Sequence, residues 1–154
     1  MTRQTYEIQL FTVEACKKLL ESIPTFIIDG DPEKYVQTIG QFPNTAYCAI
    51  AADGSILGAG GIMPLWKGVG EGWVLVPPST NEFYGIALHK TTLAYLARIV
   101  EEYKFHRVQT AVKHDFITGH RWAKRLGFIN EGPLYRYGPD QHTYYRYAKL
   151  YPRS

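Results

Sequence analysis

The sequence has little of what would support membrane insertion, disulfide bonding or metal binding. Among its 154 residues are only two cysteines, Cys16 and Cys48, and their spacing fits no zinc site. Both lie in apolar segments, so we expect small core residues of a protein from a reducing compartment. No apolar run approaches the roughly 20 residues of a membrane-spanning helix, and the N-terminus has no signal-peptide pattern. We therefore expect a cytoplasmic protein with no membrane partner.

Several catalytic motifs are missing as well. The sequence contains no P-loop for nucleotide phosphates and no G-x-S-x-G segment that would carry a serine nucleophile. Nucleotide hydrolysis and serine hydrolysis therefore have no support. Residues 135–153 interleave tyrosine with arginine and lysine, which is a pattern that can stack on bases. Alternation along a strand divides such a set between two faces of a sheet, so we do not expect a nucleic-acid partner.

What the sequence does contain is the composition of a globular domain. Apolar residues make up 45% of the chain and charged residues 20%, which allows one sizeable core. The formal net charge is +3 and the calculated pI is near 8.8, a weak bias towards anionic partners. We interpret residues 1–154 as one domain, without repeats or linkers.

Local signals in the first half predict a strand, two helices and a hairpin. Thr12 is placed to cap the first helix, and Asp31 followed by Pro32 predicts the start of the second. Two apolar runs, 46–51 and 56–63, are joined by Asp53-Gly54. Because this pair favours positive φ angles, we expect a type I′ hairpin turn.

The second half predicts a long helix between strands. We expect this helix to open at Gly85 and to end near Lys104, and Asp115 to cap a later helix that Gly127 stops. Two closing strands follow. The predicted order is βααβββαβαββ, which is α/β (α+β) with a mixed, mostly antiparallel sheet, helices on both faces and parallel strands on either side of the long helix.

The joint between a strand and the long helix, residues 73–90 (WVLVPPSTNEFYGIALHK), is suited to an anion. Unpaired N–H groups and a partial positive charge gather at a helix N-terminus. Gly85 would let the backbone approach closely, whereas the carboxylate of Glu82 would repel an anion. An ordinary strand-to-helix connection, with Gly85 present for packing, is the alternative interpretation.

The element order and several motifs resemble the GNAT superfamily of N-acyltransferases over essentially the whole chain. Leu75-Val76 matches the end of the family's fourth strand, 82–87 stands where the family has Q/R-x-x-G-x-G/A, and 125–128 contains L-G-F. The resemblance implies a GNAT-like fold and acetyl-CoA as co-substrate. The residues that it assigns to acetyl-CoA binding are Leu75, Val76, Phe83, Tyr84, Gly85, Ile86 and Ala87.

The same resemblance implies an N-acetyltransferase that acts on a primary amine of a protein or a small molecule. It assigns polarisation of the thioester carbonyl to the N–H group of Val76 and proton abstraction to Glu71. These two residues are five apart, so a regular strand would turn them to opposite faces, and we expect a bulge near Gly70 and Gly72 to correct this. An exposed carboxylate at the strand end is the alternative interpretation of Glu71.

The acid that protonates the leaving thiolate is harder to assign. In the resembling family it is a tyrosine four residues before the glycine of L-G-F, and Ala123 occupies that position here. His120 is the candidate replacement, with Tyr135, Tyr137 and Tyr145 as further options. A solvent-facing helix residue is the alternative interpretation of His120.

The run GHRWAKRLGF, residues 119–128, without the family's tyrosine also resembles diverged acetyltransferase-like proteins of short-tailed bacteriophages. Some of those proteins are internal virion proteins. This finer resemblance implies an alternative function: a catalytically inactive GNAT-fold protein that binds a partner, in the host cytoplasm or in the virion. Glu82 and Ala123 favour this alternative, whereas Gly85 and Leu75-Val76 favour the enzyme.

Overall fold

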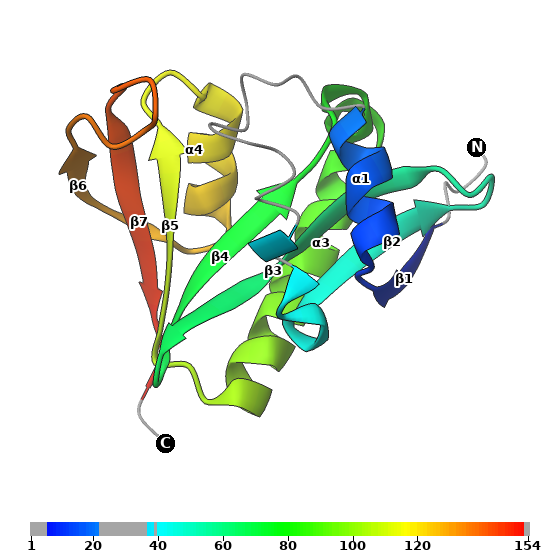
Figure 1. Ribbon diagram of the computed structural model, residues 1–154, viewed down its shortest axis with the longest axis horizontal. Coiled ribbons are helices and arrows are strands. Elements are labelled where there is room, and N and C mark those ends of the chain that lie inside the picture. Colours follow the sequence, from blue (N-terminus) through cyan, green and yellow to red (C-terminus); the bar gives the residue numbers. More distant parts are fainter. Residues whose placement is uncertain (1–5, 22–36, 39, 153–154) are drawn as a thin grey trace. The chain divides into compact units, whose positions relative to one another are not determined.

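The computed structural model describes residues 6–21, 37–38 and 40–152. The strands are β1 (Tyr6–Leu10), β2 (Ala46–Ala51), β3 (Ile56–Trp66), β4 (Val69–Leu75), β5 (Arg107–Lys113), β6 (Ile129–Leu134) and β7 (Tyr144–Leu150). The helices are α1 (Val13–Glu21), the 3-10 turn η2 (Pro43–Thr45), α3 (Pro78–Tyr103) and α4 (Ile117–Arg125) (Figure 1). The predicted helix start at Asp31 and Pro32 lies outside the described residues. None of the described helices is both long and apolar enough to cross a membrane.

The strands form one seven-stranded sheet in the order β1-β2-β3-β4-β5-β7-β6. β4 and β5 pair in parallel over Val69–Glu71 and Arg107–Gln109, and α3 connects them along the chain. The pairs β1–β2, β2–β3, β5–β7 and β6–β7 are antiparallel. The predicted mixed, mostly antiparallel sheet with parallel strands around the long helix is therefore confirmed.

Contacts group the chain into two compact units, which are described separately. The N unit comprises residues 1–63 and 73–90, and the C unit comprises residues 64–72 and 91–154. β3, β4 and α3 each contribute residues to both units. The interpretation of residues 1–154 as one domain stays a prediction.

The core of the N unit gathers around two aromatic rings. Phe11 and Trp73 pack edge to face with ring centroids 5.4 Å apart. The remaining buried members are Ala15, Leu19, Ala46, Cys48, Ala59 and Leu75. Thr12 caps α1 as predicted, because the Ala15 N–H donates to its Oγ1 at 3.1 Å. The burial of Cys48 confirms that this cysteine is a core residue.

The hairpin between β2 and β3 is confirmed, but its turn is not of type I′. In this fully described loop, Gly54 (φ 87°) is the one residue with a positive φ angle. The Gly54 N–H donates to Ala51 O and the Ala51 N–H donates to Ser55 O, each at 2.9 Å. The Asp53 carboxylate accepts from the Ser55 N–H at 2.9 Å, which keeps Asp53 out of the left-handed region. The result is a loop of residues 52–54 with glycine at the left-handed position.

α3 begins at Pro78, so the prediction that it opens at Gly85 is wrong. Proline is favoured at the first helical position, where its missing N–H costs nothing, and this outweighs the polar residues that favoured a loop. Ile86 is 77% exposed, whereas Leu88, Ile99 and Val100 are buried.

α4 ends in a Schellman motif around Gly127 and begins without a side-chain cap. Its N-cap is Phe116, so the predicted cap at Asp115 is wrong. At the other end Gly127 has φ 91° and donates its N–H to Lys124 O at 3.0 Å, while the Phe128 N–H donates to Ala123 O at 3.0 Å. The L-G-F segment is thus a helix stop that requires a residue with positive φ.

Replacement of Gly127 by alanine is expected to lower the free energy of unfolding by about 1 kcal/mol, because alanine disfavours a positive φ angle. The added Cβ would lie 3.2 Å from the flexible Lys149 Nζ, so a clash contributes little. Urea denaturation of Gly127→Ala and Gly127→Asn measures the effect. Asparagine tolerates the left-handed region better, so equal losses in both variants would contradict this explanation.

Candidate functional site

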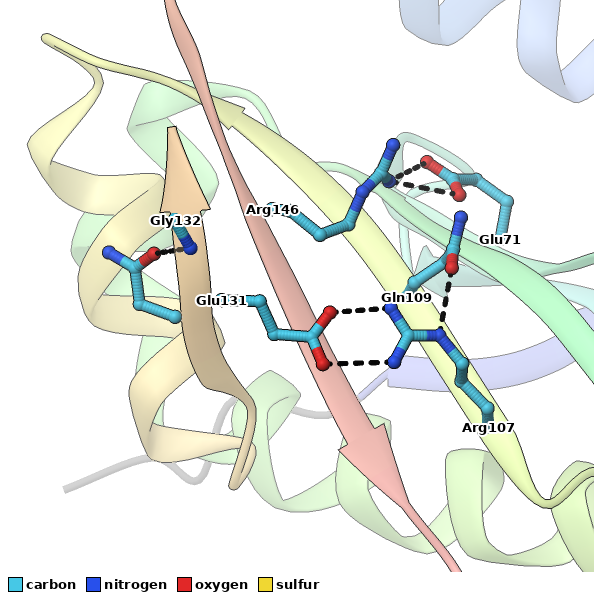
Figure 2. A network of polar contacts seen from close by, with 7 residues as sticks. Glu71, Arg107, Gln109, Glu131, Gly132 and Arg146 are labelled. Atoms are coloured by element: carbon cyan, nitrogen blue, oxygen red, sulfur yellow. Dashed lines mark hydrogen bonds and ion pairs between the residues drawn. The ribbon is translucent and has the colours of Figure 1, made fainter. Parts of the chain in front are cut away.

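Glu71 lies on β4 in the C unit and is 21% exposed at its side chain. Its partner across the parallel pair is Gln109 of β5. Figure 2 shows both residues in a polar network with Arg107, Glu131 and Arg146. The network therefore joins β4, β5, β6 and β7, which are all strands that contribute to the C unit.

The network lies on the sheet face opposite α4. Tyr145 and Tyr147 of β7 contact His120 of α4, with ring centroids 5.8 and 5.6 Å from the imidazole. Because successive side chains of a strand point to opposite faces, Arg146 between them points away from α4. The register of β7 with β5, and that of β5 with β4, place Gln109 and Glu71 on the same face of the sheet as Arg146.

Two ion pairs organise the network. Arg107 donates to both oxygens of Glu131, once at 2.9 Å from Nη1 and again from Nη2. Arg146 Nη1 lies 3.4 Å from each carboxylate oxygen of Glu71. The first pair has the fork geometry of a strong guanidinium–carboxylate contact, and the second is long.

Arg107 also fixes the orientation of the Gln109 amide. The Arg107 Nε–H donates to Gln109 Oε1 at 2.9 Å, so this oxygen faces the guanidinium. The amide nitrogen is then the atom that hydrogen-bonds to Glu71, and a nitrogen can only donate. Glu71 therefore receives hydrogen bonds from Gln109 and from Arg146.

Burial raises the pKa of Glu71 above its ordinary value, and the charge of Arg146 and the hydrogen bonds from Gln109 and Arg146 partly offset this rise. A carboxylate with a raised pKa accepts a proton more readily, as a general base needs to do. The pairing of β4 with β5 runs in regular register over Val69–Glu71, so it has no bulge at Gly70, and the predicted bulge near Gly72 stays a prediction.

His120, the predicted thiolate acid, has both ring nitrogens bonded within the C unit. Nε2 lies 3.0 Å from Lys113 O and 3.1 Å from His114 O, and Nδ1 lies 2.7 Å from the Tyr147 hydroxyl. Carbonyl oxygens only accept, so Nε2 carries a proton, and in the tautomer with Nδ1 unprotonated this nitrogen accepts from the Tyr147 hydroxyl. This arrangement ties α4 to β5 and β7, and the acid role of His120 stays a prediction.

The tyrosines named as further acid candidates differ in their surroundings. Tyr145 contacts His120 on the α4 side of the sheet. Tyr137 lies with Tyr144 at a ring separation of 5.3 Å, and Arg146 stacks over the Tyr137 ring at 5.7 Å. Tyr135 is 78% exposed. Of these three tyrosines, Tyr137 is the one whose contacts with described residues reach the Glu71 network.

Ala123, at the position of the resembling family's tyrosine, is 5% exposed and supplies the carbonyl of the α4 Schellman motif. A phenol has no place there without repacking. Arg146 was missed by sequence reasoning, because its relation to Glu71 depends on the order β4-β5-β7, which joins strands far apart in the sequence.

The residues predicted to bind acetyl-CoA fall into two groups in the N unit. Leu75 ends β4 in the core, and half-buried Val76 follows it directly before Pro77. A Cβ placed on Gly58 of β3 would lie 3.1 Å from Leu75 O and 3.4 Å from Val76 Cγ2. Glycine at this position therefore lets β3 lie close to the end of β4.

The second group, 83–87, lies inside α3 rather than in a loop before it. Tyr84 packs its ring edge against Tyr6 of β1, with centroids 6.1 Å apart. The side chain of Phe83 lies outside the description. The helix begins at Pro78, which has no N–H group, so the first-turn amides without a partner in the helix are those of residues 79 and 80.

Comparison with known proteins supports the architecture. No model of a protein family matches the sequence, and no curated protein matches it either. Solved structures do match: Ard1 from Thermoplasma volcanium has a TM-score of 0.78 at 18% identity, covering 96% of this chain and 99% of that one. The NatC complex bound to Gag peptide and CoA gives a TM-score of 0.76 at 12% identity, with 96% and 99% coverage.

A further match carries the family name in its description. The acetyltransferase (GNAT family) from Bacillus anthracis has a TM-score of 0.71 at 15% identity, and 96% of each chain is covered. These likenesses extend over nearly the whole of both chains. The chain therefore has the GNAT fold, and the predicted α+β architecture is confirmed.

Proposed function

We propose that this chain is an acetyl-CoA-dependent N-acetyltransferase that acts on a primary amine of a protein or a small molecule, with Glu71 as general base. The observation that carries the proposal is the environment of Glu71, a largely buried carboxylate with a raised pKa and two hydrogen-bond donors. The chain has the fold of known acetyltransferases, and one matching structure is bound to CoA and a peptide.

The chemistry needs one proton acceptor and one proton donor. An amine attacks the thioester carbonyl, the new C–N bond forms, and the C–S bond breaks. The proton of the amine passes to the Glu71 carboxylate, and the leaving thiolate takes up a proton. His120 stays the predicted donor of this last proton, and because both of its nitrogens have partners in the protein, water is the alternative donor.

The residues at the end of β4 fit the co-substrate. Acetyl-CoA would supply the activated acetyl group and an anionic pyrophosphate. Leu75 and Val76 lead directly into α3, whose N-terminus at Pro78 suits an anion. We propose that Val76 N–H faces the thioester, that the first-turn amides of residues 79 and 80 hold the phosphates, and that 83–87 lines the site from within the helix.

A second candidate function is a GNAT-fold protein without catalysis, of the kind found in short-tailed bacteriophages, that binds a partner in the host cytoplasm or the virion. The buried Ala123 favours it, because the position that carries a phenol in the resembling family has no acid here. This candidate predicts no saturable binding of acetyl-CoA.

Calorimetric titration of the purified protein with acetyl-CoA separates the two candidates, with CoA and ATP as controls for general anion binding. The enzyme is expected to bind acetyl-CoA and CoA saturably and ATP at least tenfold more weakly, since a site shaped for the pantetheine arm recognises more than phosphate. Absence of binding at millimolar acetyl-CoA would overturn the acetyltransferase and leave the binding protein.

A further inference from the structure

The two arginines of the Glu71 network differ in how many of their donors are used. All three guanidinium nitrogens of Arg107 have protein partners: Nε binds Gln109, and Nη1 and Nη2 bind Glu131. Arg146 uses Nη1 alone among the described residues, and its contacts with Glu71 are 3.4 Å long. Within the described part of the chain, no acceptor is bonded to Nε or Nη2 of Arg146.

The guanidinium of Arg146 is held in place although most of its donors are available. Its Cζ stacks 5.7 Å from the centre of the Tyr137 ring, and Tyr137 in turn packs on Tyr144 at 5.3 Å. The side chain of Arg146 is only 18% exposed. A restrained, partly desolvated guanidinium with unused donors binds carboxylate more strongly than one that moves freely in water.

The chemistry of Glu71 and Arg146 is complementary to a zwitterion. A carboxylate that takes the proton of an ammonium group lies beside a guanidinium that binds an anion. Since Nη1 is 3.4 Å from Glu71, the two recognition points are close, so the ammonium and the anion of a matching ligand are only a few bonds apart. An α-amino acid has this spacing.

We propose that the acceptor of this site is a compound whose primary amine has a carboxylate a few bonds away, of the α-amino acid class, and that Arg146 binds this carboxylate while Glu71 receives the amine proton. The proposal rests on the acetyltransferase function proposed above. Arg146 is then the residue that determines acceptor specificity, and Arg107 positions Glu71 through Gln109.

The first test measures kcat/KM for alanine and phenylalanine and for their C-terminal amides, in the wild type, Arg146→Gln and Arg107→Gln. Loss of Arg146 also removes a charge that lowers the pKa of Glu71, so rates are compared on the high-pH plateau of each variant. Arg146→Gln is expected to lower the acid-to-amide ratio of kcat/KM by about 10- to 100-fold, the effect of one charge-assisted contact.

Arg107→Gln is the matched control, because its donors are all engaged within the protein. It is expected to change the rates for acids and amides by the same factor, through the orientation of Gln109. If Arg146→Gln also lowers both rates by one factor, Arg146 only positions Glu71 and the proposal is overturned. A higher kcat/KM of the wild-type enzyme for the amides than for the acids would overturn the proposal as well.

A second test does not require turnover. N-acetylalanine has the carboxylate without the reactive amine, and it is expected to shift the Arg146 Nε–H resonance of arginine-labelled protein while leaving that of Arg107 unchanged. If the Arg146 resonance shifts but acetyl-CoA does not bind, the anion site at Arg146 is supported and the proposed acetyltransferase function is overturned. If acetyl-CoA binds but the Arg146 resonance does not shift, the acetyltransferase function is supported and the role of Arg146 in carboxylate binding is overturned.

Discussion

Replacement of Glu71 by glutamine is expected to lower kcat/KM for any amine acceptor by about 10²- to 10⁴-fold, the usual contribution of a positioned general base. Glutamine keeps the size of the side chain and can still hydrogen-bond to Arg146, so the loss reports the missing proton acceptor. The dissociation constant of acetyl-CoA is expected to remain within about twofold, because the proposed cofactor residues begin only at Leu75 on the same strand.

The pH profile makes this expectation more specific. Ionised Glu71 is the active form, so kcat/KM should rise as pH increases through its pKa. Because burial raises this pKa, the rise is expected at a higher pH than an ordinary glutamate would give. Glu71→Gln should remove that limb of the profile, and Arg146→Gln should move it to still higher pH, since the positive charge of Arg146 lowers the pKa.

Glu101→Gln is the control, since Glu101 is an exposed carboxylate of α3. For both variants, initial rates are measured with acetyl-CoA and an amino acid acceptor by detecting the released thiol. Unchanged turnover in Glu71→Gln would remove Glu71 as the base, and a limb that persists in this variant would assign the titration to another group.

The strands and two of the helix ends were predictable, because a few neighbouring residues decide the structure there. Thr12 caps its helix through an N–H three residues away, and Gly127 stops α4 because glycine tolerates φ 91°. The start of α3 was not predicted, because a polar first turn and a polar loop have similar compositions. There the double proline before Ser79 was the better signal.

The candidate site divides in the same way. Glu71 was found through a motif position, whereas Arg146 and Arg107 reach it only because β5 and β7 lie between β4 and β6 in the sheet. Such pairings depend on tertiary structure, and no local pattern encodes them. Tyr145 and Tyr147 show that strand alternation was the useful sequence rule, because it sends them to the face opposite Arg146.

Restoring a tyrosine at the family's acid position is expected to destabilise the protein without activating it. Ala123 is 5% exposed, and its carbonyl accepts the Phe128 N–H in the motif that ends α4. A phenol ring at this buried position must displace its neighbours. We expect Ala123→Tyr to lower the free energy of unfolding by about 3 kcal/mol, at the upper end for overpacking of a core.

Lys124→Tyr is the matched control, since it adds the same ring to the exposed neighbouring position on α4. Its stability is expected to stay within about 0.5 kcal/mol of the wild type. For both variants, the free energy of unfolding is measured by urea denaturation, and kcat is measured with an amino acid acceptor. A stable Ala123→Tyr protein with raised kcat would contradict this expectation. It would show that the phenol reaches the leaving thiolate and that the absence of an acid at position 123 limits protonation of the thiolate in the wild type.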